Sequence, residues 1–332
     1  MNKTLSYIHP ENAPDRSVKE VLQQEFCLSV HQMRSVKFSE GGLTVNGSDH
    51  LPSGRLVTTG TLLHPGDQLT VTFPQGTIRV ATDFTPDDLP PIQILYEDDD
   101  LVFLHKPAGM VAHPAGSHAK DTLVNYLASR YEQPARLIGR LDKDTSGVIG
   151  AAKSTVALRR MELQRSEGIL HRDYLALVHG EMIGSGVCGI PLKKAKSARL
   201  TGENGHPLTL MVPADIDEEG SLPAGTEWTA LETRLIGDEP VTMLRLHLLT
   251  GRTHQIRAHM AALGHPLLGD GLYGPEYLSV PAFASIDRTM LHSYQVTCRQ
   301  PFNETILTIK TEPPEDFQRL WDQGRQLIKS GC

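Results

Sequence analysis

The sequence predicts an α+β fold organised as two domains. Strand-like and helix-like stretches intermingle along the 332 residues without the regular strand–helix–strand rhythm of a doubly wound fold, and no repeat of fixed period is evident. A chain of this length has room for about two domains. A Pro- and Asp-rich run, PDDLPP, begins at residue 86 and breaks any regular element there. We therefore expect a small α/β unit over residues 1–85, a linker over 86–93 and a larger α+β unit over 94–332.

The smaller unit is predicted to contain two short helices followed by small strands. Serines that can cap a helix precede two stretches with apolar residues at helical spacing. An Asn-Gly pair after a short apolar strand is typical of a tight hairpin turn. The predicted elements are a helix capped by Ser17 and carrying Val18, Val21 and Leu22, a helix capped by Ser29 and carrying Val30, Met33 and Lys37, a strand over 43–45 that enters Asn46-Gly47, and a strand over 68–73.

The larger unit mixes strands and helices. Its clearest strand covers residues 242–250, where every second residue from 244 to 248 is leucine and the residues between them face the other way. Helix starts and stops follow from capping residues, glycine and proline. The other predicted elements are a buried strand over 101–104, a helix capped by Asp121 and running through Arg130, a helix capped by Ser154 and ended by Gly168, a strand over 174–178, and a helix after Gly251 with Ile256, Met260 and Leu263 inward.

The composition excludes several classes of protein. Hydrophobic residues make up 39% of the chain, which is enough for a folded core. No stretch approaches the roughly 20 apolar residues of a membrane span, and the polar start MNKT shows no secretory signal. The cysteines, at 27, 188, 298 and 332, stand too far apart for a disulfide framework or a thiolate metal site. We therefore expect a cytoplasmic protein without a membrane segment.

The formal net charge of −7 argues, at face value, against a nucleic-acid partner, because phosphate contacts need Lys and Arg. The charge is unevenly distributed, however. Residues 86–100 carry −6 and residues 211–240 carry −7, whereas residues 101–210 carry +6 and include the run KKAK from residue 193. We therefore expect a basic binding face with the two acidic pieces held away from it.

The segment LIGRLDKDTSG, residues 137–147, is the first candidate for chemistry. It can be a capped turn in which Asp and Ser satisfy backbone donors, or it can present a nucleophilic Asp held ionised by a neighbouring Arg. The spacing alone favours neither. The D-x-D-x-T signature of metal-dependent phosphatases is a rival interpretation of residues 142–145, although Arg140 interrupts the apolar strand that this motif needs.

The segment GRTHQIRAH, residues 251–259, is the second candidate. Its two histidines are separated by about 140° around a helix, so they do not share a face as a zinc-binding pair would. His254 and Arg257 do share one. The pattern disfavours a metal site and favours a cationic cluster that faces a phosphate or a carboxylate. An ordinary solvated helix face is the alternative.

Together these segments resemble the RluA family of RNA pseudouridine synthases. The similarity follows the family's order through residues 94–274, with ILYEDDD from residue 94, KPAGM from 106, RLD-x-x-TSG from 140, R-x-Y-x-A from 172, GRTHQIR from 251 and GHP-x-LGD from 264. The family usually has His where Gly139 stands and often Lys where Arg172 stands. The smaller unit resembles the αL-type RNA-binding domain shared by a small-subunit ribosomal protein and several RNA-modifying enzymes.

The resemblance implies a pseudouridine synthase fold, with a mixed, largely antiparallel central sheet flanked by helices and loops. It also implies isomerisation of specific uridines in structured RNA, ribosomal or transfer RNA, with no metal, no organic cofactor and no obligate protein partner. The alternatives left open are an inactive RNA-binding protein of the same fold and, more remotely, the phosphatase.

The resemblance also assigns roles to single residues. Asp142 is the expected nucleophile, Arg257 pairs with it and keeps it charged and oriented, and Tyr174 lies against the uracil. Because the target base must leave the RNA stack, Arg140 is expected to displace or replace it. The remaining expected RNA contacts are Arg252, His254, Arg34 and Lys37.

Overall fold

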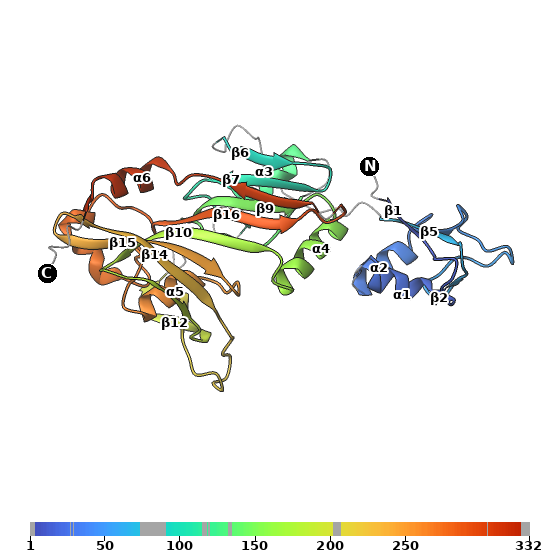
Figure 1. Cartoon of the computed structure of the whole chain (residues 1–332), viewed down its shortest axis with the longest axis horizontal. Coiled ribbons are helices and arrows are strands. Elements are labelled where there is room, and N and C mark those ends of the chain that lie inside the picture. The colour runs from blue at the N-terminus through green and yellow to red at the C-terminus, as the bar shows by residue number, and fades with distance from the viewer. Residues whose placement is uncertain are drawn as a thin grey trace.

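The computed structural model describes residues 4–26, 28, 30–73, 91–114, 118, 120–131, 135–201, 207–303 and 305–326. The predicted cap at Ser29 and most of the predicted linker, residues 86–90, lie outside these ranges. Figure 1 shows a large body that holds most of the strands and a smaller unit beside helix α4 (Thr155–Ser166).

The smaller unit has its own sheet and its own hydrophobic core. Ser17 caps the first helix as predicted, because its hydroxyl accepts the Glu20 N–H while the Glu20 carboxylate accepts the Ser17 N–H. Residues from both helices and from the strands form one buried cluster. The elements are β1 (Thr4–Ile8), β2 (Arg16–Ser17), α1 (Val18–Gln24), α2 (Val30–Lys37), β3 (Leu43–Val45), β4 (Leu62–Leu63) and β5 (Gln68–Thr72), and the sheet order is β1-β5-β3.

The large body is built on an 11-stranded sheet with the main order β11-β14-β15-β10-β16-β9-β7-β6. All its strand pairs are antiparallel except β9 and β16. The mixed, largely antiparallel sheet predicted for this part is therefore confirmed. Its strands are β6 (Gln93–Glu97), β7 (Leu101–Lys106), β8 (Arg136–Leu137), β9 (Ser146–Ala152), β10 (His171–His179), β11 (Ser185–Cys188), β14 (Thr226–Ile236), β15 (Glu239–Leu248), β16 (Leu291–Arg299), β17 (Ile306–Lys310) and β18 (Arg325–Gln326).

A separate hairpin and several helices complete the large body. The hairpin pairs β12 (Leu192–Thr201) with β13 (Pro207–Pro213), and it packs against α5 (Gln255–Ala262). The other helical elements are α3 (Leu123–Arg130), α6 (Glu315–Asp322), η2 (Pro275–Ser279) and η3 (Pro281–Phe283). None of the described helices is long and apolar enough to cross a membrane.

Two details of the predicted helices are wrong. Thr122, not Asp121, caps α3, because the Thr122 hydroxyl accepts the Asn125 N–H while Asp121 contacts His118 instead. Leu263, predicted to point inward, lies at the C-cap of α5 and is 37% exposed. Both errors fall at helix ends, where neighbouring residues compete for the same position.

The smaller unit contacts the large body through α4. The side-chain amide of Gln32 donates to the Thr155 carbonyl (2.9 Å), and the Arg160 guanidinium donates to the Glu25 carbonyl (3.3 Å). Val156 is fully buried and belongs to the core of the smaller unit. The end of α2 that carries Arg34 and Lys37 therefore belongs to a unit that is docked on the large body. The boundary at residue 85 and the linker over 86–93 stay predictions.

Candidate active site

The two candidate segments of the sequence meet at one cavity. This cavity has a volume of about 230 Å³ and opens between the β8–β9 loop, β10 and the start of α5. Three of its lining residues were predicted to act together, namely Asp142, Tyr174 and Arg257. The other lining residues are Gly139, Arg140, Leu141, Thr145, Arg165, Arg172, Leu248, Gly251, Arg252, Thr253, His254, Gln255, Ile256 and Leu291.

Asp142 lies in the loop between β8 and β9, and buried cations hold the backbone of this loop. The ammonium of Lys106 donates to the carbonyl of Lys143 (2.9 Å) and to two carbonyls of its own segment (2.8 Å each). The guanidinium of Arg288 donates to the carbonyl of Asp144 (3.2 Å). These contacts fix the backbone of the loop. The side chain of Asp142 is 24% exposed.

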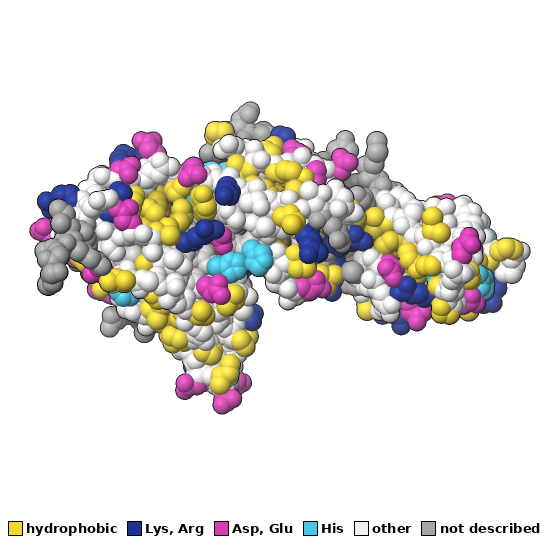
Figure 2. Space-filling model, in the orientation of Figure 1, with side chains coloured by type: hydrophobic (Ala, Val, Ile, Leu, Met, Phe, Trp, Pro, Cys, Tyr) yellow, Lys and Arg dark blue, Asp and Glu magenta, His cyan; other side chains and the backbone are white. Residues whose placement is uncertain are grey.

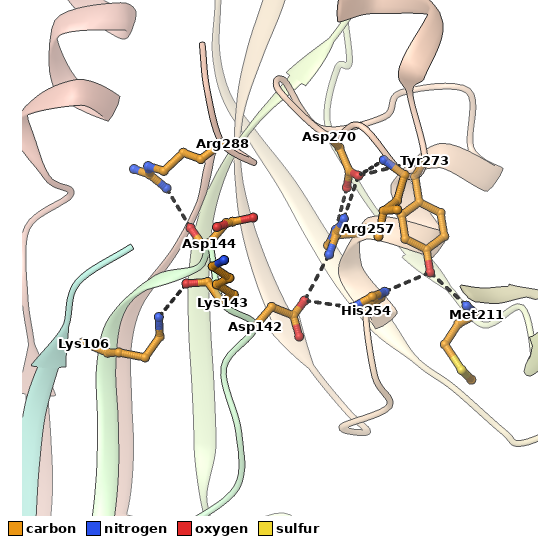
Figure 3. Close-up of polar contacts among 11 residues, drawn as sticks. Lys106, Asp142, Lys143, Asp144, Met211, His254, Arg257, Asp270, Tyr273 and Arg288 are labelled. Carbon is orange, nitrogen blue, oxygen red and sulfur yellow. Dashed lines mark hydrogen bonds and ion pairs between the residues drawn. The ribbon is translucent and has the colours of Figure 1, made fainter. Parts of the chain in front are cut away.

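Arg257 joins Asp142 to a second carboxylate (Figure 3). Its Nη1 lies 3.5 Å from Oδ2 of Asp142, which is the contact expected from the sequence. Arg257 makes a bidentate pair with Asp270, however, in which Nε donates to Oδ2 (2.6 Å) and Nη2 donates to Oδ1 (2.8 Å). Burial lowers the pKa of Arg257, but the bonds and charge of Asp270 outweigh it and raise the pKa above its usual value. Arg257 is therefore a fixed, permanent cation beside Asp142.

Tyr174 lies on β10 and lines the same cavity while only 4% of its surface is exposed. Burial raises the pKa of its phenol, so that the neutral form is favoured at physiological pH. The charge of Arg172 acts in the opposite direction on this pKa without outweighing burial. A neutral phenol with a flat, apolar face is suited to stacking on a nucleobase.

Gly139 and Arg172, the two departures from the family pattern, are neighbours in space. Gly139 has a φ of +86°, and a Cβ built on it would lie 2.9 Å from Nη1 of Arg172. The same guanidinium donates to the carbonyl of Ile138 (2.6 Å). The space of a side chain at position 139 is therefore filled by Arg172.

The predicted RNA contacts divide into two groups. Arg140, Arg252 and His254 line the cavity, and Nε of Arg252 donates to the Pro223 carbonyl (3.0 Å). Arg34 and Lys37 are exposed on α2 of the smaller unit, outside the set of lining residues. The lining residues include five arginines and one carboxylate, Asp142, so the cavity suits an anionic ligand.

The expected separation of acidic and basic pieces holds only in part. Residues 215–219 of the second acidic piece are exposed, and Figure 2 shows acidic side chains at the tip of the lower projection. Glu218 nevertheless pairs with Lys193 on β12. That acidic piece thus neutralises part of the basic hairpin, because β13 leads directly into it. Residues 86–90 of the first acidic piece lie outside the described residues, and Glu97 in its described part pairs with Lys153 and Arg130.

Comparison with known proteins identifies the family. Residues 100–262 match the family described as RNA pseudouridylate synthase. Ribosomal large subunit pseudouridine synthase D of Nitrosomonas europaea is 34% identical over 72% of this chain and 67% of its own. The protein of the same name from Xanthomonas campestris pv. campestris is 31% identical over 96% of this chain and 91% of its own. The chain belongs to the RNA pseudouridylate synthase family.

Solved structures agree with this assignment. The structure titled Human RNA Pseudouridylate Synthase Domain Containing 1 is 26% identical with a TM-score of 0.55, over 72% of this chain and 91% of that one. Human RNA Pseudouridylate Synthase Domain Containing 4 shares the fold at 21% identity and a TM-score of 0.52, over 69% of this chain and 92% of that one.

The synthase converts uridine in RNA to pseudouridine, and the predicted resemblance and enzyme class are confirmed. The phosphatase interpretation of residues 142–145 is wrong, because these residues lie within the matched synthase segment. Asp142, Tyr174 and Arg257 line one cavity, so their placement offers no support for an inactive protein of this fold. Within the described residues, no three His, Cys, Asp or Glu side chains are grouped as metal ligands would be.

Sequence reasoning missed three residues of the synthase that support the site. Asp270 and Lys106 stand in the GHP-x-LGD and KPAGM motifs. These motifs could be recognised in the sequence, but no role could be assigned to either residue. Tyr273 had no signal at all. It lies beside His254 and Arg257 only because the chain after α5 folds back over that helix.

Proposed function

We propose that this synthase isomerises one or more uridines of large-subunit ribosomal RNA, with Asp142 as the nucleophile. The observation that carries the proposal is the position of Asp142, the one carboxylate among five arginines lining the cavity, beside Arg257 and on the same cavity as Tyr174. The names of the relatives in Nitrosomonas and Xanthomonas support the ribosomal substrate. Transfer RNA remains the second target class, and a cytoplasmic location follows from either substrate.

The reaction needs one nucleophile and no net redox change. The bond from ribose C1′ to uracil N1 breaks, a bond from C1′ to uracil C5 forms, and the hydrogen on C5 is replaced while N1 gains one. Asp142 attacks the ribose or the base, as carboxylates do at other glycosidic centres. Arg257 orients the carboxylate through their 3.5 Å contact, and Tyr174 stacks on the uracil and helps to remove the C5 proton. No organic cofactor, metal or protein partner is required by this scheme.

The proposed RNA contacts lie around the cavity and on the smaller unit. The base must leave the RNA stack to reach Asp142, and Arg140, two residues away, takes its place. Arg252 and His254 extend the contact along the cavity wall, and Arg34 and Lys37 of the αL-type unit contact RNA farther away.

Tritium release from RNA labelled with [5-³H]uridine, measured in EDTA, tests the chemistry. The wild-type protein should release tritium and Asp142→Asn should not. Loss of activity on chelation, or a wild-type rate in the variant, would refute the proposal. Pseudouridine mapping in a deletion strain then identifies the target: missing sites in large-subunit ribosomal RNA support it, and losses confined to transfer RNA reject that part.

A further inference from the structure

We propose that Tyr273 and His254 form a positioning pair that holds the Asp142 carboxylate through Oδ2, the oxygen that Arg257 also contacts, and links it to strand β13. The inference rests on the proposed role of Asp142 as nucleophile. It gives His254 a role toward Asp142, in addition to the RNA contact expected from the sequence.

A continuous line of contacts carries the inference (Figure 3). The backbone N–H of Met211, on β13, donates to the Tyr273 hydroxyl at 2.9 Å. That hydroxyl lies 3.3 Å from Nδ1 of His254, and Nε2 of the same ring lies 3.9 Å from Oδ2 of Asp142. The His254 and Tyr273 rings meet edge to face, at 90°.

The donors and acceptors along this line select one arrangement of hydrogens. A backbone N–H can only donate, so the Tyr273 oxygen is the acceptor for Met211. Its own proton is then free to be donated to Nδ1 of His254. The ring hydrogen consequently lies on Nε2, facing the carboxylate of Asp142. The opposite tautomer would leave the phenol proton without a partner and aim a ring lone pair at a carboxylate.

The surroundings of His254 favour its neutral form. Burial is the largest cause that lowers the pKa of His254, and the charges of Arg257 and Arg140 act in the same direction. Asp142 and Asp270 oppose them but do not outweigh them. A neutral ring can orient Asp142 through an N–H without adding a second full charge to the one supplied by Arg257.

The backbone of His254 is a second, independent sign of a fixed position. It is the N-cap of α5 with a φ of +51° and a ψ of +20°, and its side chain makes no capping bond to that helix. A left-handed conformation costs a non-glycine residue about 1–3 kcal/mol in general, and such residues cluster at functional sites. Here the conformation directs the ring toward Asp142 and Tyr273 instead of toward the helix.

A double-mutant cycle tests the pair. Tyr273→Phe keeps the ring over Arg257 (5.3 Å) but removes the hydroxyl, and His254→Gln keeps a side-chain N–H but removes the imidazole. Loss of the orienting contact between the His254 N–H and the Asp142 carboxylate (3.9 Å) should lower kcat by about 3- to 10-fold. KM for RNA should be unchanged in Tyr273→Phe, because Tyr273 is not one of the proposed RNA contacts. In the His254→Gln background, Tyr273→Phe should lower kcat by less than about twofold if Tyr273 acts through His254. The control Tyr277→Phe removes a hydroxyl from the neighbouring segment and should leave kcat unchanged.

Nitrogen chemical shifts of the His254 ring give an independent readout, assigned by difference from His254→Gln. The wild-type ring should be the Nε2–H tautomer, and Tyr273→Phe should raise its pKa because the donor to the neutral form is lost. A Nδ1–H tautomer, or kcat losses that multiply in the double variant, would overturn the inference. If wild-type protein releases no tritium, the proposed function fails instead, and the tautomer measurement still decides the pairing.

Discussion

At Gly139 the chain differs from its family at a position that touches the active site, and the structure supplies a physical reason. Any side chain there would meet the guanidinium of Arg172, which donates to the Ile138 carbonyl next to Gly139. The two departures therefore form one compatible pair. The guanidinium of Arg172, from β10, fills the space that a side chain at position 139 would take.

Gly139→Ala should consequently impair the enzyme by more than backbone strain alone. At a positive φ, alanine costs about 1–3 kcal/mol, and the contact with Arg172 adds to that cost. Gly168→Ala is the matched control, because Gly168 has a φ of +68° and nothing within 4 Å of its Cβ position. Urea unfolding and kcat should show a larger loss for Gly139→Ala, and Arg172→Lys should recover part of it. Equal losses in the two alanine variants would contradict this account.

Asp270 is the second residue whose effect can be predicted. Its side chain is fully buried, and it supplies both bonds that hold Arg257. Asp270→Asn should destabilise the fold by about 3 kcal/mol, because it leaves a buried guanidinium without its counter-charge. It should also lower kcat more than it weakens RNA binding. Asp173→Asn, which breaks a pair with Arg245 outside the cavity lining, should leave kcat near wild type; a matching loss of kcat there would argue against a specific role.

For single residues, the sequence predicts which side chains take part in the site but not which side chains they pair with. Asp142, Tyr174 and Arg257 could be selected because each stands in a short motif. Asp270 could not be assigned to Arg257, since the pairing depends on how the chain turns after α5. The helix cap at Ser17 was predicted correctly because Glu20 completes it locally, whereas at Asp121 and Thr122 two good capping residues compete.

The β8–β9 loop carries Asp142, the proposed nucleophile, and Lys106 from β7 anchors its backbone. Burial lowers the pKa of Lys106 to about 7, while the charges of Asp144 and Asp142 act in the opposite direction. Three carbonyl acceptors, one for each proton of an ammonium, hold the charged form in place.

Lys106→Met should therefore disturb the loop. Three carbonyls would lose their donor, which costs about 1–3 kcal/mol for each buried group left unpaired. The bond to the Lys143 carbonyl would no longer fix the backbone next to Asp142. We expect a lower unfolding midpoint in urea and a kcat reduced by at least tenfold, about 1.4 kcal/mol. Lys153→Met is the control, because Lys153 also donates to a carbonyl (2.6 Å) but outside the cavity lining. Equal effects of both variants on kcat would reject the anchoring role.

Single elements were predictable where periodicity is strong, and their partners were not. Alternation identified β15 and capping identified α4. The order of the strands and the parallel pairing of β9 with β16 join segments that are 146 residues apart, as between Ser146 and His292. No short pattern records such a pairing, because the contact is made by the fold and not by neighbours in the chain.

The basic end of α2 belongs to a unit that is docked on the same body that holds the cavity. Contacts with α4 fix the smaller unit to the large body, and we expect Arg34 and Lys37 to contact RNA while a uridine occupies the cavity. Arg34→Gln with Lys37→Gln should weaken RNA binding and lower the salt slope of log Kd by about 1.5, since two phosphate contacts are lost. Lys19→Gln with Arg55→Gln, exposed cations elsewhere on the same unit, should change the slope less. Identical slopes for the two pairs would exclude a specific contact by α2.

Buried histidines govern how the stability of the molecule depends on pH. Burial lowers the pKa of His179 and of His292 to about 4, and it also lowers the pKa of His105 and His259. Between pH 6.5 and 4 the unfolded chain binds protons at these residues and the folded chain does not. The free energy of unfolding should therefore fall as the pH falls through this window. His247 and His64 oppose the trend, because their pKa values are raised mainly by their bonds to Asp173 and to Asp15.

His292 offers the cleanest measurement of this effect, because its ring is fully buried between the Ser146 hydroxyl and the Thr311 carbonyl. A shift from 6.5 to about 4 corresponds to about 3 kcal/mol of stability lost on acidification. Urea unfolding of His292→Gln at pH 7 and pH 5 should give a smaller difference than wild type, even if the variant is less stable at both. His50→Gln, at an exposed position, should keep the wild-type difference. In the folded protein the ring of His292 stays neutral until the pH approaches 4, so His292→Gln should leave the shape of the pH dependence of kcat between pH 7 and 5 unchanged.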